Sequence, residues 1–148
     1  MSDTSESSTP ILPPRGQGPA ALPSRPEDVP AAFAARFNSG DPEAVAALYE
    51  PRAAFVPASG APVRGAAAIA AQNAPFLALG LPIAVRTRHV HVAGDGDIAL
   101  LVVDWEIGDV RATATDVARR GADGYWRYVI DSPFGAAPRN DRLTPSGT

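Results

Sequence analysis

RATATDVARRGADGYWRYVIDSPFG, residues 111–135, has the pattern of two β-strands joined by a short turn. Its first part alternates Thr and Val with Ala and Asp, which is the two-residue period of a strand. GADG at 121–124 is typical of a tight reversal, because Gly and Asp tolerate positive φ. Tyr125 to Asp131 is rich in aromatic and β-branched residues, which suit a pleated, half-buried surface. The stretch therefore predicts a β-hairpin.

The hairpin carries two acidic residues, Asp116 and Asp131, whose relative orientation depends on the register of its strands. With an even number of loop residues, Arg120 pairs with Tyr125, and Val129 lies opposite Asp116. Directly opposed residues share a face of a sheet, so both aspartates would then point the same way, with alanines and Val129 around them. The other face would hold Trp126, Tyr128 and Ile130. An odd loop or a bulge would instead separate the two acids.

The composition indicates a single globular domain with tails. The chain has 148 residues, of which 45% are hydrophobic, so a core can form. A formal net charge of -3 and arginines scattered along the chain argue against a nucleic-acid surface, which would show clustered basic residues. The absence of cysteine excludes disulfides, thiolate metal sites and thiol nucleophiles.

The two ends of the chain differ from its middle. Residues 1–25 are rich in Ser, Thr and Pro and predict a disordered tail, and residues 136–148 predict a second, flexible one. The domain itself is expected at 26–135. The N-terminal segment lacks the pattern of a secretory signal, which predicts a cytoplasmic location. The long uncharged run at 65–85 is interrupted by Pro and Gly, so a membrane span is not expected.

Helices are predicted before most of the strands. Pro26 to Asn38 has apolar residues spaced by four, and Asp41-Pro42 is a typical start for a second helix, which would bury Val45, Leu48 and Tyr49. A third helix is expected from Ala66 to Leu79. The remaining strands are expected at 53–56, 82–92 and 97–107. This order predicts an α+β fold with a mostly antiparallel sheet.

Several local phrases resemble the nuclear transport factor 2-like superfamily. They are the NSGD turn between helices, the entry LYEPRAAFVP into the first strand, and the terminal hairpin DVARRGADGYWRYVIDSPFG. Within that superfamily the chain is similar to the SnoaL-like, ketosteroid-isomerase-like bacterial proteins over about residues 26–135. The resemblance implies a curved sheet wrapped around three N-terminal helices into an open cone, and a homodimer packed through the sheet.

The ketosteroid isomerases provide a test residue by residue. They use an aspartate base together with a tyrosine and a protonated aspartic acid as donors to the oxyanion. The tyrosine position, five residues before the Asn of the NSGD turn, falls here on Phe33, and the base position falls on Pro57. Asp116 alone matches, at the acid position before the last turn. Because Phe33 has no hydroxyl and Pro57 cannot take a proton, steroid isomerisation by that mechanism is not predicted.

The resemblance points to pocket acid–base chemistry without a cofactor or a metal. Two carboxylates that face one another in an apolar pocket cannot both ionise cheaply, so Asp116 and Asp131 are the candidate catalytic residues. The candidate ligand-binding residues are Phe33, Tyr49, Pro57, Asn73, Phe76, Trp105 and Val129. A competing interpretation is structural, in which Asp131 caps the turn at SPFG and Asp116 pairs with Arg111 or Arg127.

Polar residues interrupt the apolar third helix at Gln72 and Asn73. One of the two amides could hydrogen-bond a ligand at the mouth of the cone. More often, a residue of this kind satisfies a neighbouring backbone group. The position alone does not decide between these two roles.

Three classes of function stay open at this point. The first is a cofactor-independent isomerase, cyclase or hydratase acting on a small hydrophobic carbonyl compound. The second is a non-catalytic dimer that binds a small hydrophobic molecule, and the third is an adaptor for another protein. His89 and His91 share a strand face, but a metal site would need a third ligand there, so a solvated or dimer-facing pair is the simpler interpretation.

Overall fold

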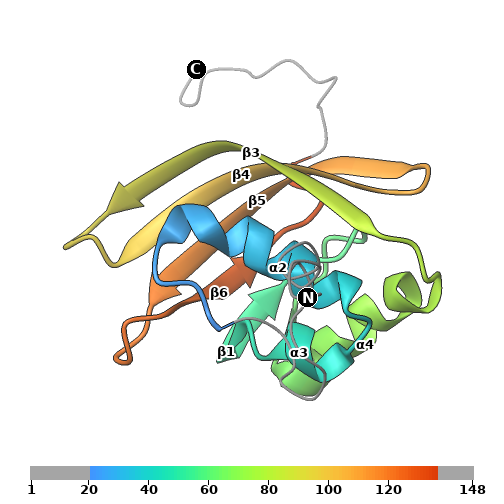
Figure 1. Cartoon of the computed structure of the whole chain (residues 1–148), viewed down its shortest axis with the longest axis horizontal. Helices are drawn as coiled ribbons and strands as arrows, with labels where there is room; N and C mark the ends of the chain where they lie inside the picture. Colours follow the sequence, from blue (N-terminus) through green and yellow to red (C-terminus); the bar gives the residue numbers. More distant parts are fainter. Residues whose placement is uncertain (1–20, 137–148) are drawn as a thin grey trace, which may run out of the picture.

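The computed structural model describes residues 21–136 and has one sheet with helices on one of its faces (Figure 1). The helical elements are η1 (Pro26–Asp28), α2 (Val29–Asn38), α3 (Pro42–Ala46) and α4 (Ala66–Ala78). The strands are β1 (Tyr49–Phe55), β2 (Val63–Arg64), β3 (Ile83–Ala93), β4 (Ile98–Ile107), β5 (Val110–Arg120) and β6 (Trp126–Asp131). The predicted α+β class is confirmed.

The sheet is curved, and the helices lie in its concave side (Figure 1). Its strand order is β2-β1-β6-β5-β4-β3, in which β1 and β6 run parallel and all other neighbours are antiparallel. Register shifts interrupt three of the strand pairs. Because bulges bend strands and increase their twist, they help the sheet to wrap around the helices. The predicted cone with three helices is confirmed.

The helix predicted from Pro26 begins with the 3-10 turn η1 and becomes α-helical at Val29, whereas the second helix begins as its sequence indicates. The side chain of Asp41 accepts a hydrogen bond from the backbone N–H of Glu43 at 3.0 Å, and Pro42 occupies the first turn, as predicted. Val29, Phe37 and Val45 are buried in the core against the sheet. This packing holds α2 and α3 against the sheet.

The second helix is shorter than predicted, and the first strand is longer. The helix ends at Ala46, whereas Tyr49, expected on that helix, is the first residue of β1. The reason is a tertiary partner that no local pattern reveals. The N–H of Tyr128 donates to the carbonyl of Leu48 at 2.9 Å, and Tyr49 pairs with Tyr128 in the parallel ladder. Pairing with β6 thus extends β1 toward α3.

The predicted register of the hairpin is wrong, although its turn is correct. Arg120 pairs with Trp126 instead of Tyr125, so the loop at 121–125 has an odd number of residues. A bulge at Val129 then shifts the register, so that Val117 pairs with Ile130. The two irregularities compensate, and both acids are buried on the concave side. Trp126 and Tyr128, expected on the other face, are also buried there, while Ile130 is exposed.

The predicted N-terminal tail begins to pack before its expected end. Leu22 contacts the core, and the carbonyl of Pro23 accepts a hydrogen bond from the N–H of Trp126 at 2.8 Å. The rest of the two predicted tails, residues 1–20 and 137–148, lies outside the described residues. None of the helices between residues 21 and 136 is long and apolar enough to cross a membrane.

Candidate functional site

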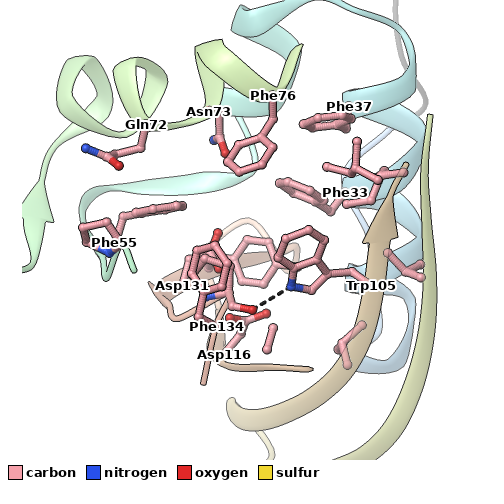
Figure 2. A pocket seen from close by; sticks show the side chains of 18 of the residues that line it. Phe33, Phe37, Phe55, Gln72, Asn73, Phe76, Trp105, Asp116, Asp131 and Phe134 are labelled. Carbon is pink, nitrogen blue, oxygen red and sulfur yellow. Dashed lines mark hydrogen bonds between the residues drawn. The ribbon is translucent and has the colours of Figure 1, made fainter. Parts of the chain in front are cut away.

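A cavity of about 430 Å³ lies between the concave face of the sheet and helices α2 and α4. This volume falls within the range of roughly 300–1,000 Å³ that is common for small-molecule sites. Aromatic side chains dominate its wall, among them Phe33, Phe37, Phe55, Phe76 and Trp105. Figure 2 shows Asn73 and Phe76 pointing from α4 into the cavity, opposite Asp116 and Asp131, which come from the sheet. The cavity is therefore apolar except for a few grouped polar side chains.

The polar group on the sheet side is a pair of buried carboxyls. Asp116 is 4% exposed and Asp131 is 6% exposed, and both line the cavity. The two side chains share a hydrogen bond, and the backbone N–H of Ser132 donates to Oδ1 of Asp116 at 2.9 Å. The pair is thus held by the residue that follows β6 as well as by its own contact.

Tyr49 and Asn73 complete the hydrogen-bond network behind the pair. The hydroxyl of Tyr49 donates to Oδ2 of Asp131 at 2.5 Å, and Nδ2 of Asn73 lies 3.5 Å from the same hydroxyl. Burial raises the pKa of Tyr49 well above its ordinary value, and the charge of Asp131 adds to this effect. Tyr49 therefore keeps its proton and serves as a donor to Asp131.

The two carboxyls differ in their preference for the proton. Burial raises the pKa of Asp116 well above its ordinary value, and the charge of Asp131 raises it further. Burial also raises the pKa of Asp131, but the hydrogen bonds from Asp116 and Tyr49 act against that shift. These causes favour the proton on Asp116 and the charge on Asp131 when the pair carries a single proton.

The specific contacts of the competing structural interpretation are wrong. Arg111 lies 4.0 Å from Glu106, and Arg127 forms a 2.8 Å ion pair with Asp123 in the turn. Neither arginine therefore neutralises Asp116. The backbone contact at the SPFG turn is also the reverse of the expected one, because Asp116, not Asp131, accepts the N–H of Ser132.

The structure brings five of the predicted ligand-binding residues to the cavity wall, namely Phe33, Pro57, Asn73, Phe76 and Trp105. Trp105 is fixed there because its indole N–H donates to the carbonyl of Pro133 at 2.6 Å. Tyr49 is not on that wall and instead supports Asp131 from behind. Val129 is also absent from the wall, because it is the extra residue of the bulge in β6.

Gln72 and Tyr128 also lie on the wall, and the sequence signalled only Gln72. Gln72 lines the cavity beside Asn73, so both amides that interrupt the third helix reach it. Tyr128 also lines the cavity, although the predicted register placed it on the opposite face of the sheet. The odd number of residues in the loop at 121–125 causes that difference, because it pairs Tyr128 with Ala118, and no residue type in the sequence signals it.

The histidine pair lies apart from this cavity. His89 and His91 stack with their ring centroids 5.6 Å apart, and both are exposed. Within residues 21–136, no cluster of three or more metal-ligating side chains occurs. This part of the chain therefore offers no third ligand that would turn the pair into a metal site.

Comparison with known proteins agrees with the fold. The model of the SnoaL-like domain family matches residues 31–129. A candidate calcium/calmodulin-dependent protein kinase type II association domain from Thiobacillus denitrificans is 27% identical, with a TM-score of 0.62 over 77% of this chain and 98% of that one. No curated protein sequence matches.

Two more distant structures share the fold. A computationally designed 17-OHP binder is 11% identical, with a TM-score of 0.58 over 74% of this chain and 92% of that one. A ketosteroid isomerase-like protein from Erwinia carotovora atroseptica is 19% identical, with a TM-score of 0.52 over 72% of this chain and 90% of that one. The same fold thus occurs in a designed ligand binder and in a ketosteroid isomerase-like protein.

Proposed function

This chain belongs to the SnoaL-like domain family of the nuclear transport factor 2-like superfamily, and we propose that it binds a small hydrophobic carbonyl compound in its cone and moves a proton on it. The reaction class is a cofactor-independent isomerisation, cyclisation or hydration, with Asp116 and Asp131 as the acid and base. The observation that carries this proposal is the hydrogen-bonded carboxyl pair on the wall of an apolar cavity. A general base in such a place is shielded from water and lies close to a bound ligand.

The pair provides both halves of a proton transfer. Asp131, as the ionised partner, takes a proton from the carbon next to the carbonyl, and the C–H electron pair becomes the double bond of an enolate. The same proton can return to another carbon, which is an isomerisation, or the enolate carbon can attack an electrophilic carbon, which closes a ring. Phe33 and Pro57 line the cavity but cannot donate or accept the proton.

The experiment that tests this function works even when the natural substrate is not identified. Native mass spectrometry of the freshly purified protein reports a co-purifying small molecule directly. β-Tetralone, an apolar ketone with acidic C–H bonds, then serves as a probe in D₂O, and proton NMR follows the exchange of those protons for deuterium. We expect exchange faster than in buffer alone. Exchange at the buffer rate with the ketone bound would contradict an enzyme.

A binding protein without catalysis is the second candidate. One observation favours it. Every side-chain nitrogen or oxygen in residues 21–136 that is shielded from solvent has a hydrogen-bond partner within the protein. Asp131 is satisfied by Tyr49 and Asp116, so the carboxyl pair is stable without a ligand. The ketone exchange experiment separates this candidate from the enzyme.

The proposal includes a homodimer formed through the outer face of the sheet. His91 pairs with Leu100, Leu100 with Val117, and Val117 with Ile130, so these four side chains form a row across β3, β4, β5 and β6. Leu100 is 40% exposed and Ile130 is 39% exposed, and no helix among the described residues covers this face (Figure 1). Exposed apolar rows of this kind are typical of association surfaces.

Leu100→Arg is expected to weaken the dimer, because it places a charge in the middle of the apolar row. The dissociation constant should rise roughly tenfold to a hundredfold, the range for a central interface residue. Sedimentation velocity across a concentration series measures it. Val110→Arg is the matched control, since Val110 is similarly exposed at 39% but lies at the end of β5 outside the row. A monomeric wild-type protein, or equal effects of the two variants, would contradict the proposed interface.

A further inference from the structure

The hydroxyl of Tyr128 is a polar group on the cavity wall for which the described part of the protein provides no partner. Tyr128 is 4% exposed, and its ring contacts Phe33 edge-on at 6.0 Å and Tyr49 at 5.4 Å between centroids. Its backbone N–H donates to the carbonyl of Leu48, but its hydroxyl makes no hydrogen bond within residues 21–136. In that part of the chain, every side-chain nitrogen or oxygen that is shielded from solvent has a hydrogen-bond partner. The hydroxyl of Tyr128 has none, so it is not shielded and opens onto the cavity.

The surroundings of Tyr128 keep it a donor. Burial raises the pKa of its phenol well above the ordinary value, and the charges of Asp116 and Asp131 raise it further. The phenol is therefore protonated at neutral pH. Because this hydroxyl opens onto the cavity and has no partner among the described residues, a bound acceptor can take its hydrogen bond.

The carboxyl pair exposes hydrogen-bond acceptors to the cavity, whereas Tyr128 exposes a donor. The hydroxyl of Tyr49 and the backbone N–H of Ser132 donate into the pair, and the proton of Asp116 lies in the hydrogen bond to Asp131. Every donor in the pair is thus occupied within the protein, and the lone pairs that remain can only accept. A ligand that fits both walls must accept a hydrogen bond from Tyr128 and offer a proton to the pair.

We propose that Tyr128 binds the carbonyl oxygen of the substrate and that the substrate is an enolisable ketone whose acidic C–H lies toward Asp131. This inference rests on the proposed function and adds to it the substrate class and a third site residue. As Asp131 takes the proton, the carbonyl π electrons move onto the oxygen. The Tyr128 hydrogen bond stabilises that negative charge while the phenol keeps its own proton. Phe33 on α2, which stands where isomerases have a tyrosine, has no hydroxyl for this role, and Tyr128 on β6 supplies one.

Tyr128→Phe tests the inference, because it removes the hydroxyl and keeps the ring contacts with Phe33 and Tyr49. The probes are β-tetralone and tetralin, a hydrocarbon of similar shape without the carbonyl, and calorimetry gives both dissociation constants. We expect the wild-type protein to prefer the ketone by about fivefold, the effect of one ordinary hydrogen bond. Tyr128→Phe should bind both probes equally. Tyr125→Phe, at an exposed tyrosine in the turn, should keep the preference.

Infrared spectroscopy of the bound ketone provides a readout that does not depend on binding affinities. A hydrogen bond from Tyr128 should lower the carbonyl stretching frequency in the wild-type protein, and Tyr128→Phe should return it toward the value in an apolar solvent. An unshifted carbonyl in the wild-type protein, or a ketone preference that survives in Tyr128→Phe, would overturn the role of Tyr128 and leave the pocket function standing. If neither probe binds, the cavity is no site for such ketones and the proposed function fails with the inference.

Discussion

Asp131→Asn is expected to slow the deuterium exchange of β-tetralone by roughly 10²–10⁴-fold, which is the usual contribution of a positioned general base. Asparagine keeps the shape of the side chain, and its oxygen can still accept the hydrogen bond from Tyr49. What it loses is the ability to take a proton. The dissociation constant of tetralin should stay unchanged, because the apolar wall is intact. Proton NMR in D₂O measures the exchange rate, and calorimetry measures the binding.

Two control variants separate a base from a general loss of charge. Asp123→Asn removes an exposed carboxylate that is paired with Arg127 in the turn, and it should leave the exchange rate unchanged. Asp116→Asn should keep the fold and reduce the rate less than Asp131→Asn, since its amide can donate to Asp131 as the protonated acid does. Exchange that survives in Asp131→Asn would remove Asp131 from the base role. A loss of exchange in Asp116→Asn but not in Asp131→Asn would make Asp116 the base and Asp131 the acid.

Local chemistry in the sequence predicted the elements well. The Asp41-Pro42 helix start, the turn at 121–124 and the alternation in β5 each depend on the conformational preferences of a few adjacent residues. Gly124 adopts a φ of +88°, the conformation that the turn prediction requires. Such preferences act between neighbours in the chain, so they can be read without a structure. The resemblance to the superfamily then supplied the arrangement of the elements in space.

The pairing of distant strands could not be predicted in the same way. Both acids were expected on one face, and they are, but an odd loop together with the bulge at Val129 brings them there. A bulge depends on how β6 satisfies β1 on one side and β5 on the other, and no single residue encodes it. The odd loop also turned Tyr128 toward the cavity, so the error in the predicted register is the reason that sequence reasoning missed this residue.

The stability of the protein is expected to fall as the pH rises above 3.8, the ordinary value for aspartic acid, and Asp116→Asn is expected to remove most of that fall. The pKa of Asp116 is raised in the folded state by burial and by Asp131. Between the ordinary and the raised value, the folded protein therefore binds more protons than the unfolded chain, so the free energy of unfolding decreases with pH. This contribution is complete below the ordinary value and is lost as the pH passes the raised one.

Asparagine at position 116 reproduces the protonated acid at every pH. Its oxygen can accept the N–H of Ser132, and its amide can donate to Asp131, so no charge develops when the pH rises. Urea titrations at about pH 5 and about pH 8 measure the difference, and at the higher value the variant should be the more stable protein by roughly 1 kcal/mol or more, the worth of one pKa unit or more. Equal slopes with pH in the two proteins would show that Asp116 ionises as freely as an exposed acid.

The pH dependence also distinguishes this pair from the surface acids. The hydrogen bonds from Arg127 lower the pKa of Asp123 to about 2, so the contribution of Asp123 is lost as the pH falls, in the opposite direction. Asp123→Asn should therefore leave the decline above 3.8 unchanged. A decline that disappears in Asp116→Asn and persists in Asp123→Asn would locate the retained proton in the cavity. In the proposed reaction, Asp116 with that proton is the acid. The Asp131→Asn variant tests the base.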